Sequence, residues 1–211
     1  MEKALIFSLY LFLGLIFLGI IVTYLIETFI SPLSSTPDDV VDKIIKILSP
    51  KKKEIIVDCG AGNSNMLIQI AKSDPSIKAV GFEISPILGL FSKFNIWFHQ
   101  LILRERFEAK IYVTDLLIQH FGYKELKNPS DSNILTRAKR IATSFFIDII
   151  EVEPVDKVYC NLPQSILYLF EPKAKFLLEK GVDIYLYDTV FPNLKPRKSH
   201  KLSNGKTLYQ Y

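Results

Sequence analysis

One stretch of the chain constrains the fold more than any other. An apolar run at 55–57 ends in Asp58, a tight turn with two glycines follows, and a helical pattern begins at Asn63. Further along, a second apolar run ends in Glu83. This order predicts a β-α-β unit that binds a nucleotide, because glycines let the backbone turn tightly and approach a ligand closely. An acid at the end of the second strand can accept hydrogen bonds from ribose hydroxyls, so we expect a ligand that contains adenosine.

Strands and helices continue to alternate beyond this unit. The apolar patterns predict strands at 54–58, 78–83, 109–114, 155–161 and 182–188. They predict helices at 64–73, 86–104, roughly 116–127, within 133–150, and 165–180. Short apolar strands separated by helices imply a parallel sheet that is covered on both faces.

The end of the chain has a different pattern. Ser203-Asn204-Gly205-Lys206 indicates a type I′ hairpin between strands at 198–202 and 207–211. Five alternating strands with a closing antiparallel hairpin are the seven-strand pattern of class I methyltransferases. We therefore expect an α/β fold with a Rossmann-like, mostly parallel sheet.

The first thirty residues differ in composition from the rest. Residues 4–26 carry no charged side chain, and as a helix they would extend about 35 Å, enough to cross a bilayer core of about 30 Å. A cleavable signal peptide is the alternative, but the run is too long for one and no small-residue cleavage site follows. The expected organisation is a transmembrane anchor over 1–30, a Ser/Pro linker over 31–37 and one methyltransferase domain over 38–211.

Two further helices are expected. Thr36 can cap a helix with Pro37 at its first position. The segment 134–150 combines basic and apolar side chains, which suits an amphipathic helix over the site or on a membrane surface, or an ordinary docked helix with a solvated edge.

The glycine turn supplies most of the candidate cofactor-binding residues. In a class I methyltransferase, the N–H groups of this turn and of the next helix hold the methionine carboxylate of S-adenosylmethionine. Here the turn contains Gly60, Gly62, Asn63 and Ser64. Asp58 would face the ammonium of the methionine part.

Three other positions complete the predicted cofactor site. Ile84 lies beside the ribose-binding Glu83. Asp115 follows the third strand, where it could accept a hydrogen bond from the adenine amine while Leu116 packs on the ring. A helix cap is the alternative role for Asp115.

The fourth strand leads to the candidate catalytic residue. It runs into Asn161-Leu162-Pro163-Gln164, and the carbonyl of Asn161 could orient the lone pair of an acceptor amine. A capping turn before the next helix is the alternative interpretation.

With these residues identified, the chain resembles the prokaryotic protein lysine methyltransferases and their membrane-anchored mitochondrial relatives. The resemblance covers almost the whole chain and rests on the order of common motifs. These are a Thr-Pro-led helix at 35–41, the turn at 58–64, an aromatic-rich helix after 81–86, a Phe-Pro segment at 190–196 and a closing aromatic strand at 208–211. The chain departs from the family at Asn63-Ser64-Asn65, where the family usually has Asp-Gly-Arg.

The resemblance implies methyl transfer from S-adenosylmethionine to lysine side chains of a protein. The enzyme mainly has to align the acceptor, the methyl group and the sulfur, so we expect no dedicated general base. An anchor would restrict the protein substrates to membrane proteins and their neighbours.

Two other functions remain open at this stage. Asn161-Leu162-Pro163-Gln164 resembles the Asn-Leu-Pro-Tyr of rRNA adenine dimethylases, but Gln164 cannot stack on an extruded base as tyrosine does. We therefore do not expect nucleic acid as the partner. The departures at Asn63 and Ser64 are compatible with an inactive, membrane-anchored module that still binds the cofactor.

Charge and cysteine content bear on location and on other chemistries. The net charge of +4 is mild, and two cysteines form no disulfide framework. We expect a single-pass membrane protein whose domain is cytoplasmic, since the cofactor is made there. No group of side chains has metal-ligand spacing, so no metal is expected, and no Ser-His-Asp arrangement supports hydrolysis.

Overall fold

The fold is seen in a computed structural model, which describes residues 2–29, 36–123, 126 and 152–211. The chain divides into two units, Met1–Ser34 and Ser35–Tyr211. The first unit contains α1 (Glu2–Phe29), whose side chains from 6 to 19 are exposed. Among the described residues, no helix has both the length and the apolar character that crossing a membrane requires, so the transmembrane helix expected over 1–30 is not found there.

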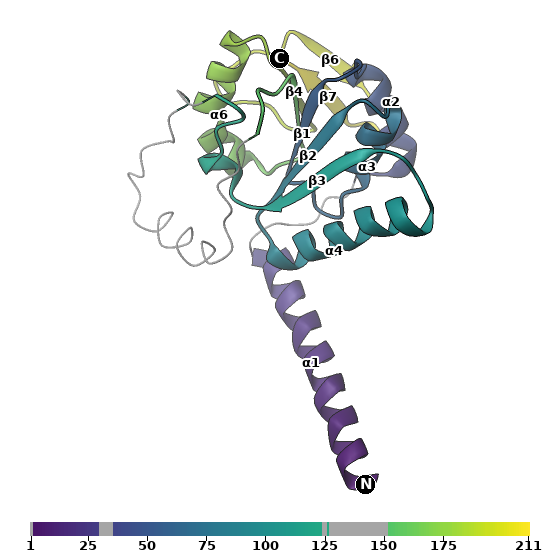
Figure 1. The fold of residues 1–211 in the computed structure, drawn as a ribbon. Coiled ribbons are helices and arrows are strands. Elements are labelled where there is room, and N and C mark those ends of the chain that lie inside the picture. The colour runs from purple at the N-terminus through teal and green to yellow at the C-terminus, as the bar shows by residue number, and fades with distance from the viewer. Residues whose placement is uncertain (1, 30–35, 124–125, 127–151) are drawn as a thin grey trace. The chain divides into compact units, whose positions relative to one another are not determined.

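The second unit is built on one seven-stranded sheet (Figure 1). The strands are β1 (Ile55–Cys59), β2 (Lys78–Glu83), β3 (Glu108–Val113), β4 (Lys157–Cys160), β5 (Asp183–Tyr187), β6 (Lys198–Lys201) and β7 (Thr207–Gln210). Their order is β3-β2-β1-β4-β5-β7-β6, with β1 to β5 parallel and β7 antiparallel to both neighbours. The prediction of a mostly parallel sheet with a closing antiparallel pair is confirmed.

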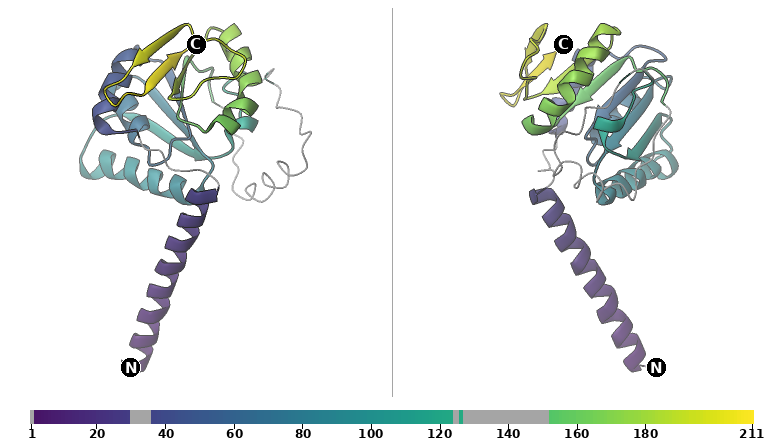
Figure 2. Two further views of the ribbon diagram at one scale, coloured as in Figure 1. Left: turned by 180° about the vertical axis from the view of Figure 1, so that it is seen from behind. Right: turned by 90° about the vertical axis from the view of Figure 1, so that its left-hand side faces the viewer.

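Helices cover both faces of the sheet (Figures 1 and 2). One face carries α2 (Asp38–Leu48), α3 (Asn65–Ser73) and α4 (Pro86–Trp97), which continues as the π-helix η1 (Phe98–Ile102). The other face carries α6 (Gln164–Glu179) and the short 3₁₀ helix η2 (Leu116–Ile118). Because both faces are covered, β1, β4 and most of β2 and β5 are buried along their length.

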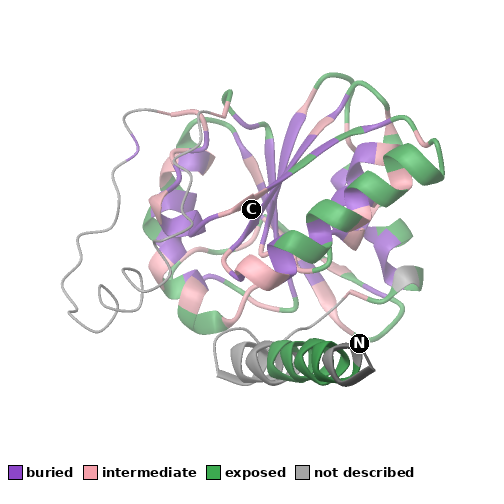
Figure 3. Cartoon of the chain, turned by 60° about the horizontal axis from the view of Figure 1, so that its bottom comes forward, coloured by how far each residue is buried: buried purple, intermediate pink, exposed green. Residues whose placement is uncertain are grey.

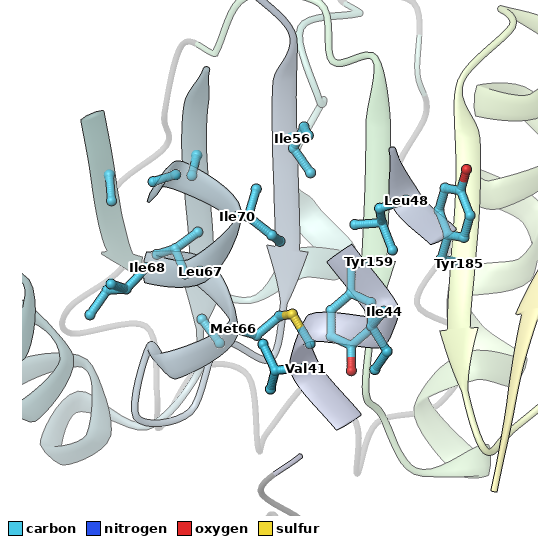
Figure 4. Close-up of a cluster of buried hydrophobic side chains, with 14 of the residues drawn as sticks. Val41, Ile44, Leu48, Ile56, Met66, Leu67, Ile68, Ile70, Tyr159 and Tyr185 are labelled. Carbon is cyan, nitrogen blue, oxygen red and sulfur yellow. The ribbon is translucent and has the colours of Figure 1, made fainter. Parts of the chain in front are cut away.

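Alternation along the strands separates two apolar cores. In β4, Tyr159 joins the core under α2 and α3, whereas its neighbours Val158 and Cys160 join the core under α6. Figure 4 shows Tyr159 beside Val41, Ile44 and Met66 in the first core. These cores fix the strand ends that carry the candidate site.

The helix predicted over 116–127 is wrong. Of the described residues in this range, only η2 is helical; Gln119 is extended, and Phe121 and Gly122 have φ values of 51° and 82°. A helix cannot continue through positive φ values, so the apolar residues here pack as a turn. The helix predicted within 133–150 lies outside the described residues.

Two turn predictions also need correction. Thr36 does not cap α2, because its Oγ1 lies 3.2 Å from the Tyr159 hydroxyl and the helix has no side-chain cap. The hairpin turn is not type I′, which needs two positive φ values, since only Gly205 has one (80°). Gly205 N donates to Leu202 O at 3.2 Å, which makes a type I-like turn closed by a glycine bulge.

Candidate functional site

The candidate site lies at the carboxyl ends of β1, β2 and β4. The order of the sheet reverses between β1 and β4, and ligands of open α/β sheets bind outside the strand ends at such a point. Asp58 lies near the end of β1 and Glu83 ends β2, the neighbouring strand. Asn161 directly follows β4, on the other side of β1.

The glycine turn has the strained geometry that its sequence predicts. Gly60, Gly62 and Ser64 have φ values of 78°, 52° and 65°. Gly60 N and Ala61 N donate to Phe82 O at 2.8 and 3.0 Å, which fastens the turn to β2. The two glycines adopt these angles without the steric penalty that Ser64 incurs.

Glu83 joins the two loops of the site. Its Oε2 accepts a hydrogen bond from Gly62 N at 2.9 Å, and its Oε1 accepts one from Ser85 N at 2.8 Å. Each carboxylate oxygen has a second lone pair, so a hydroxyl can still donate to it. The side chain therefore holds the turn in place and keeps acceptor capacity for a ribose.

Side chains of α4 hold the same turn, although no sequence motif points to them. Ser92 Oγ donates to Gly62 O, and Asn95 Nδ2 donates to Asn63 O at 3.0 Å. Neither residue belongs to a local motif, because each meets the turn only through the packing of α4. Asn63 itself is exposed, and its Oδ1 accepts from Asn65 N at 3.1 Å.

The two acids are electrostatically unusual. Burial, and secondarily the charge of Glu83, raises the pKa of Asp58 to about 7. Burial also raises the pKa of Glu83, although hydrogen bonds from the N–H groups of Ser85, Gly62 and Ile84 oppose that rise. Negative charge is disfavoured at both carboxyls, so a cationic group bound beside them would be stabilised.

Asp115 takes the role of a helix cap. Its Oδ1 accepts from Leu117 N at 2.9 Å at the start of η2, and both Asp115 and Leu116 are buried. Thr114 N donates to Glu83 O at 2.8 Å, so the chain leaves β3 beside the end of β2. The contact of Asp115 and Leu116 with adenine stays a prediction, as does that of the half-buried Ile84.

The segment after β4 lies against the glycine turn. A Cβ on Gly60 would meet Leu162 Cδ2 at 2.8 Å and Asn161 O at 3.6 Å. Gln164 Nε2 donates to Val190 O at 2.8 Å, so this side chain is held by the segment after β5. The sheet thus brings the candidate catalytic residue next to the candidate cofactor turn, although Asn161 and Gly60 are a hundred residues apart in sequence.

The two cysteines are neighbours at the centre of the sheet. Cys59 and Cys160 are paired in register, and both are fully buried free thiols. Burial and the adjacent Cys160 raise the pKa of Cys59 well above its ordinary value. The Cys59 thiol therefore stays protonated, and both buried side chains pack as small apolar groups.

Comparisons with known proteins find similarity to methyltransferases. No family model matches the chain. It is 30% identical over 161 residues to the methylase subunit of the type I restriction enzyme MjaVIII from Methanocaldococcus jannaschii. That alignment covers 75% of this chain, which spans only 23% of the subunit.

A solved structure has a similar fold. An RNA methyltransferase from Salinibacter ruber matches with a TM-score of 0.51 at 17% identity, over 84% of this chain and 92% of that one. Together with the strand order, this likeness shows that the chain has the α/β fold of class I S-adenosylmethionine-dependent methyltransferases.

Proposed function

We propose that the chain binds S-adenosylmethionine and transfers its methyl group to an amine. The observation that carries the proposal is the pairing of a backbone-anchored Glu83 with the buried, charge-disfavoured Asp58 beside a glycine turn. Asp58 would receive the ammonium of the cofactor, and Glu83 would receive the ribose hydroxyls. The Salinibacter enzyme was crystallised with S-adenosyl-L-homocysteine, which supports the choice of cofactor.

The residues after β4 would orient the acceptor. The side-chain oxygen of Asn161 would accept a hydrogen bond from the acceptor amine and direct its lone pair at the methyl carbon. A nitrogen–carbon bond then forms as the sulfur–carbon bond breaks, which leaves S-adenosylhomocysteine. The acceptor loses one proton to water, so alignment is the main contribution of the protein.

Lysine side chains of a protein are the proposed acceptor class. Support comes from the order of motifs shared with protein lysine methyltransferases, from the Thr-Pro start to the Phe-Pro segment. The latter is built into the core, where Phe191 N donates to the Tyr211 hydroxyl at 3.0 Å and the two rings lie 4.9 Å apart. A lysine acceptor also needs no aromatic residue at position 164 to stack on it.

Adenine in a nucleic acid is the second candidate, and the similarity to the restriction methylase subunit favours it. The Asn-Leu-Pro part of 161–164 is shared with adenine dimethylases. Against it, Gln164 is hydrogen-bonded to Val190 O and offers no stacking surface.

We further propose that the chain works at a membrane, with its domain in the cytoplasm. The support is the charge-free run at 4–26 and the exposed apolar side chains of α1, such as Phe7, Phe12 and Phe17. Substrates would then be membrane proteins or their neighbours.

The test is methyl transfer by the full chain from labelled S-adenosylmethionine to host membrane proteins and to host nucleic acid in parallel. The expected result is label on lysines, located by mass spectrometry. Label in adenine would instead show that nucleic acid, and not protein lysine, is the methyl acceptor. Asn161→Ala should abolish transfer and keep cofactor binding, while Gln164→Ala serves as the matched control in the same turn. Absence of heat on titrating S-adenosylmethionine into the full chain would refute the proposal as a whole.

A further inference from the structure

An apolar surface covers the outer side of α4 and η1. It consists of six residues, here named the α4 apolar face: Leu90, Phe91, Phe94, Trp97, Phe98 and Leu101. Their spacing places them on one side of the helix, opposite the buried side that packs on β3. Figure 3 shows the two sides, exposed outward and buried toward the sheet.

The exposure of this face is large for a folded domain. Leu90, Phe91 and Phe94 are 69%, 62% and 59% exposed, although the same helix buries Leu88 and Ile96. The ring centroids of Phe94 and Trp97 lie 5.5 Å apart and those of Phe94 and Phe98 lie 6.3 Å apart, so these three aromatic side chains form one cluster. Contiguous apolar patches of this kind mark surfaces that contact a membrane or a partner.

The charges around the α4 apolar face favour a membrane over a protein partner. Lys93, Arg104 and Arg106 are exposed along or just after the two helices, and no acid lies between 84 and 104. Glu105, the acid nearest to η1, is paired with Lys72 at 2.7 Å and with His99 at 2.6 Å. Aromatic and aliphatic side chains bordered by cations, with the acid neutralised, are typical of a helix that lies on an anionic bilayer.

A groove beside the face adds one further lysine, Lys110. It has a volume of about 270 Å³ between α4 and the edge strand β3, and Lys93, Trp97, Lys110 and Tyr112 are among its lining residues. Glu108, also exposed on β3, lies 3.7 Å from Lys110. Two lysines and an indole at one groove suit the phosphate of a lipid headgroup above its acyl chains.

We propose that the α4 apolar face lies on the surface of a lipid bilayer that contains anionic lipid, with its side chains among the upper acyl chains. The inner side of the same helix holds the glycine turn through Ser92 and Asn95. Membrane contact and the candidate cofactor turn are thus on opposite sides of one helix. The α4 apolar face contains no residue of α1, and its proposed role does not depend on the proposed methyl transfer.

Trp97 makes the test local, because it is the only tryptophan in the chain. The full chain is added to vesicles of phosphatidylcholine and phosphatidylglycerol, with and without bromine atoms on the acyl chains. We expect a blue shift of the Trp97 emission and its quenching by the brominated chains, both weaker in pure phosphatidylcholine and at high salt. Vesicle-bound chain with unshifted and unquenched Trp97 fluorescence would overturn the proposal, since α1 alone would then account for binding.

Variants separate lipid contact from other causes. Phe91→Gln with Leu101→Gln should remove the quenching, whereas Tyr168→Gln, at a 64% exposed aromatic on α6, should leave it unchanged. Circular dichroism checks that each variant is folded. A blue shift without vesicles that grows with protein concentration would assign the face to contact between copies and overturn the proposal.

Discussion

Replacing Asp58 by asparagine should make the ligand-free protein more stable at neutral and alkaline pH. The carboxyl is buried, and its pKa rises on folding from 3.8 to about 7. The folded state therefore favours the protonated form, while the unfolded chain ionises freely above pH 3.8. Stability is lost as the pH rises from 3.8 to about 7, and the loss is complete above that value.

The size of the effect follows from the difference between these two pKa values. That difference corresponds to about 4 kcal/mol, of which about 3 kcal/mol falls between pH 5 and pH 8. Asparagine has nearly the same shape and no charge, so the Asp58→Asn variant should not show this loss. The stability gained by the variant over the wild type should thus be up to about 3 kcal/mol larger at pH 8 than at pH 5.

The assay is urea unfolding of the full chain in mild detergent, followed by Trp97 fluorescence at both pH values. S-adenosylmethionine binding provides a second measurement with the opposite sign. In the proposed site its ammonium pairs with the ionised Asp58, so wild-type affinity should rise with pH through about 7. The variant should bind about 10- to 100-fold more weakly at pH 8, as expected for a lost hydrogen bond to a charged group.

Parallel stability profiles for wild type and variant would refute the reasoning. They would mean that Asp58 ionises in the folded state as it does in the unfolded one, so that burial does not disfavour its charge. Asp156→Asn is a poor comparison, because that carboxylate accepts Ile55 N at 2.8 Å. Asp188→Asn, at an exposed ion pair with Lys206, is the better control, because solvent screens such a pair and its loss should change stability little.

Three other changes test packing and charge elsewhere in the domain. Glu83→Gln replaces one of two anchored acceptor oxygens by a donor, so it should destabilise the turn by about 1–3 kcal/mol in urea unfolding and weaken cofactor binding in calorimetry. Gly89→Ala places a Cβ against Val113 Cγ2 and should lower stability by about 1–3 kcal/mol, and adding Val113→Ala should restore most of it if this contact is the cause. Lys157→Met leaves Glu54, whose Oε2 lies 2.6 Å from the Lys157 ammonium, without a counter-charge, and it should lower stability by about 3–5 kcal/mol. The double variant Glu54→Gln with Lys157→Met should lose clearly less stability, because no unpaired charge is left buried.

The sequence predicted the sheet well because its signals were local. Runs such as 55–57 and 79–82 carry no charged side chain, as strands covered on both faces require, and each is followed by its own turn or helix signal. The segment 116–127 failed for the opposite reason. Its apolar residues fit a helix, but positive φ values at Phe121 and Gly122 let Phe121 pack against Phe82 and Phe170.

The candidate site was predictable only in part. Positions at strand ends could be inferred from the strand pattern, which brought Asp58, Glu83 and Asn161 to one edge of the sheet. The raised pKa of Asp58 depends on its burial in the folded domain. The hydrogen bond from Ser92 to Gly62 O depends on how α4 packs. The exposed side of α4 was likewise hidden, since periodicity does not tell which apolar residues a helix leaves uncovered.

The two neighbouring thiols, Cys59 and Cys160, allow the opening of the middle of the sheet to be measured. Alkylating reagents attack a thiolate in contact with water, whereas Cys59 and Cys160 are sealed between α6 and the sheet. Under native conditions, the rate of labelling therefore measures how often β1 and β4 come apart. Cys59 adjoins Asp58, and Cys160 adjoins Asn161. Any molecule that binds at the strand ends should therefore lower the rate of thiol labelling, so binding can be detected before the ligand is chemically identified.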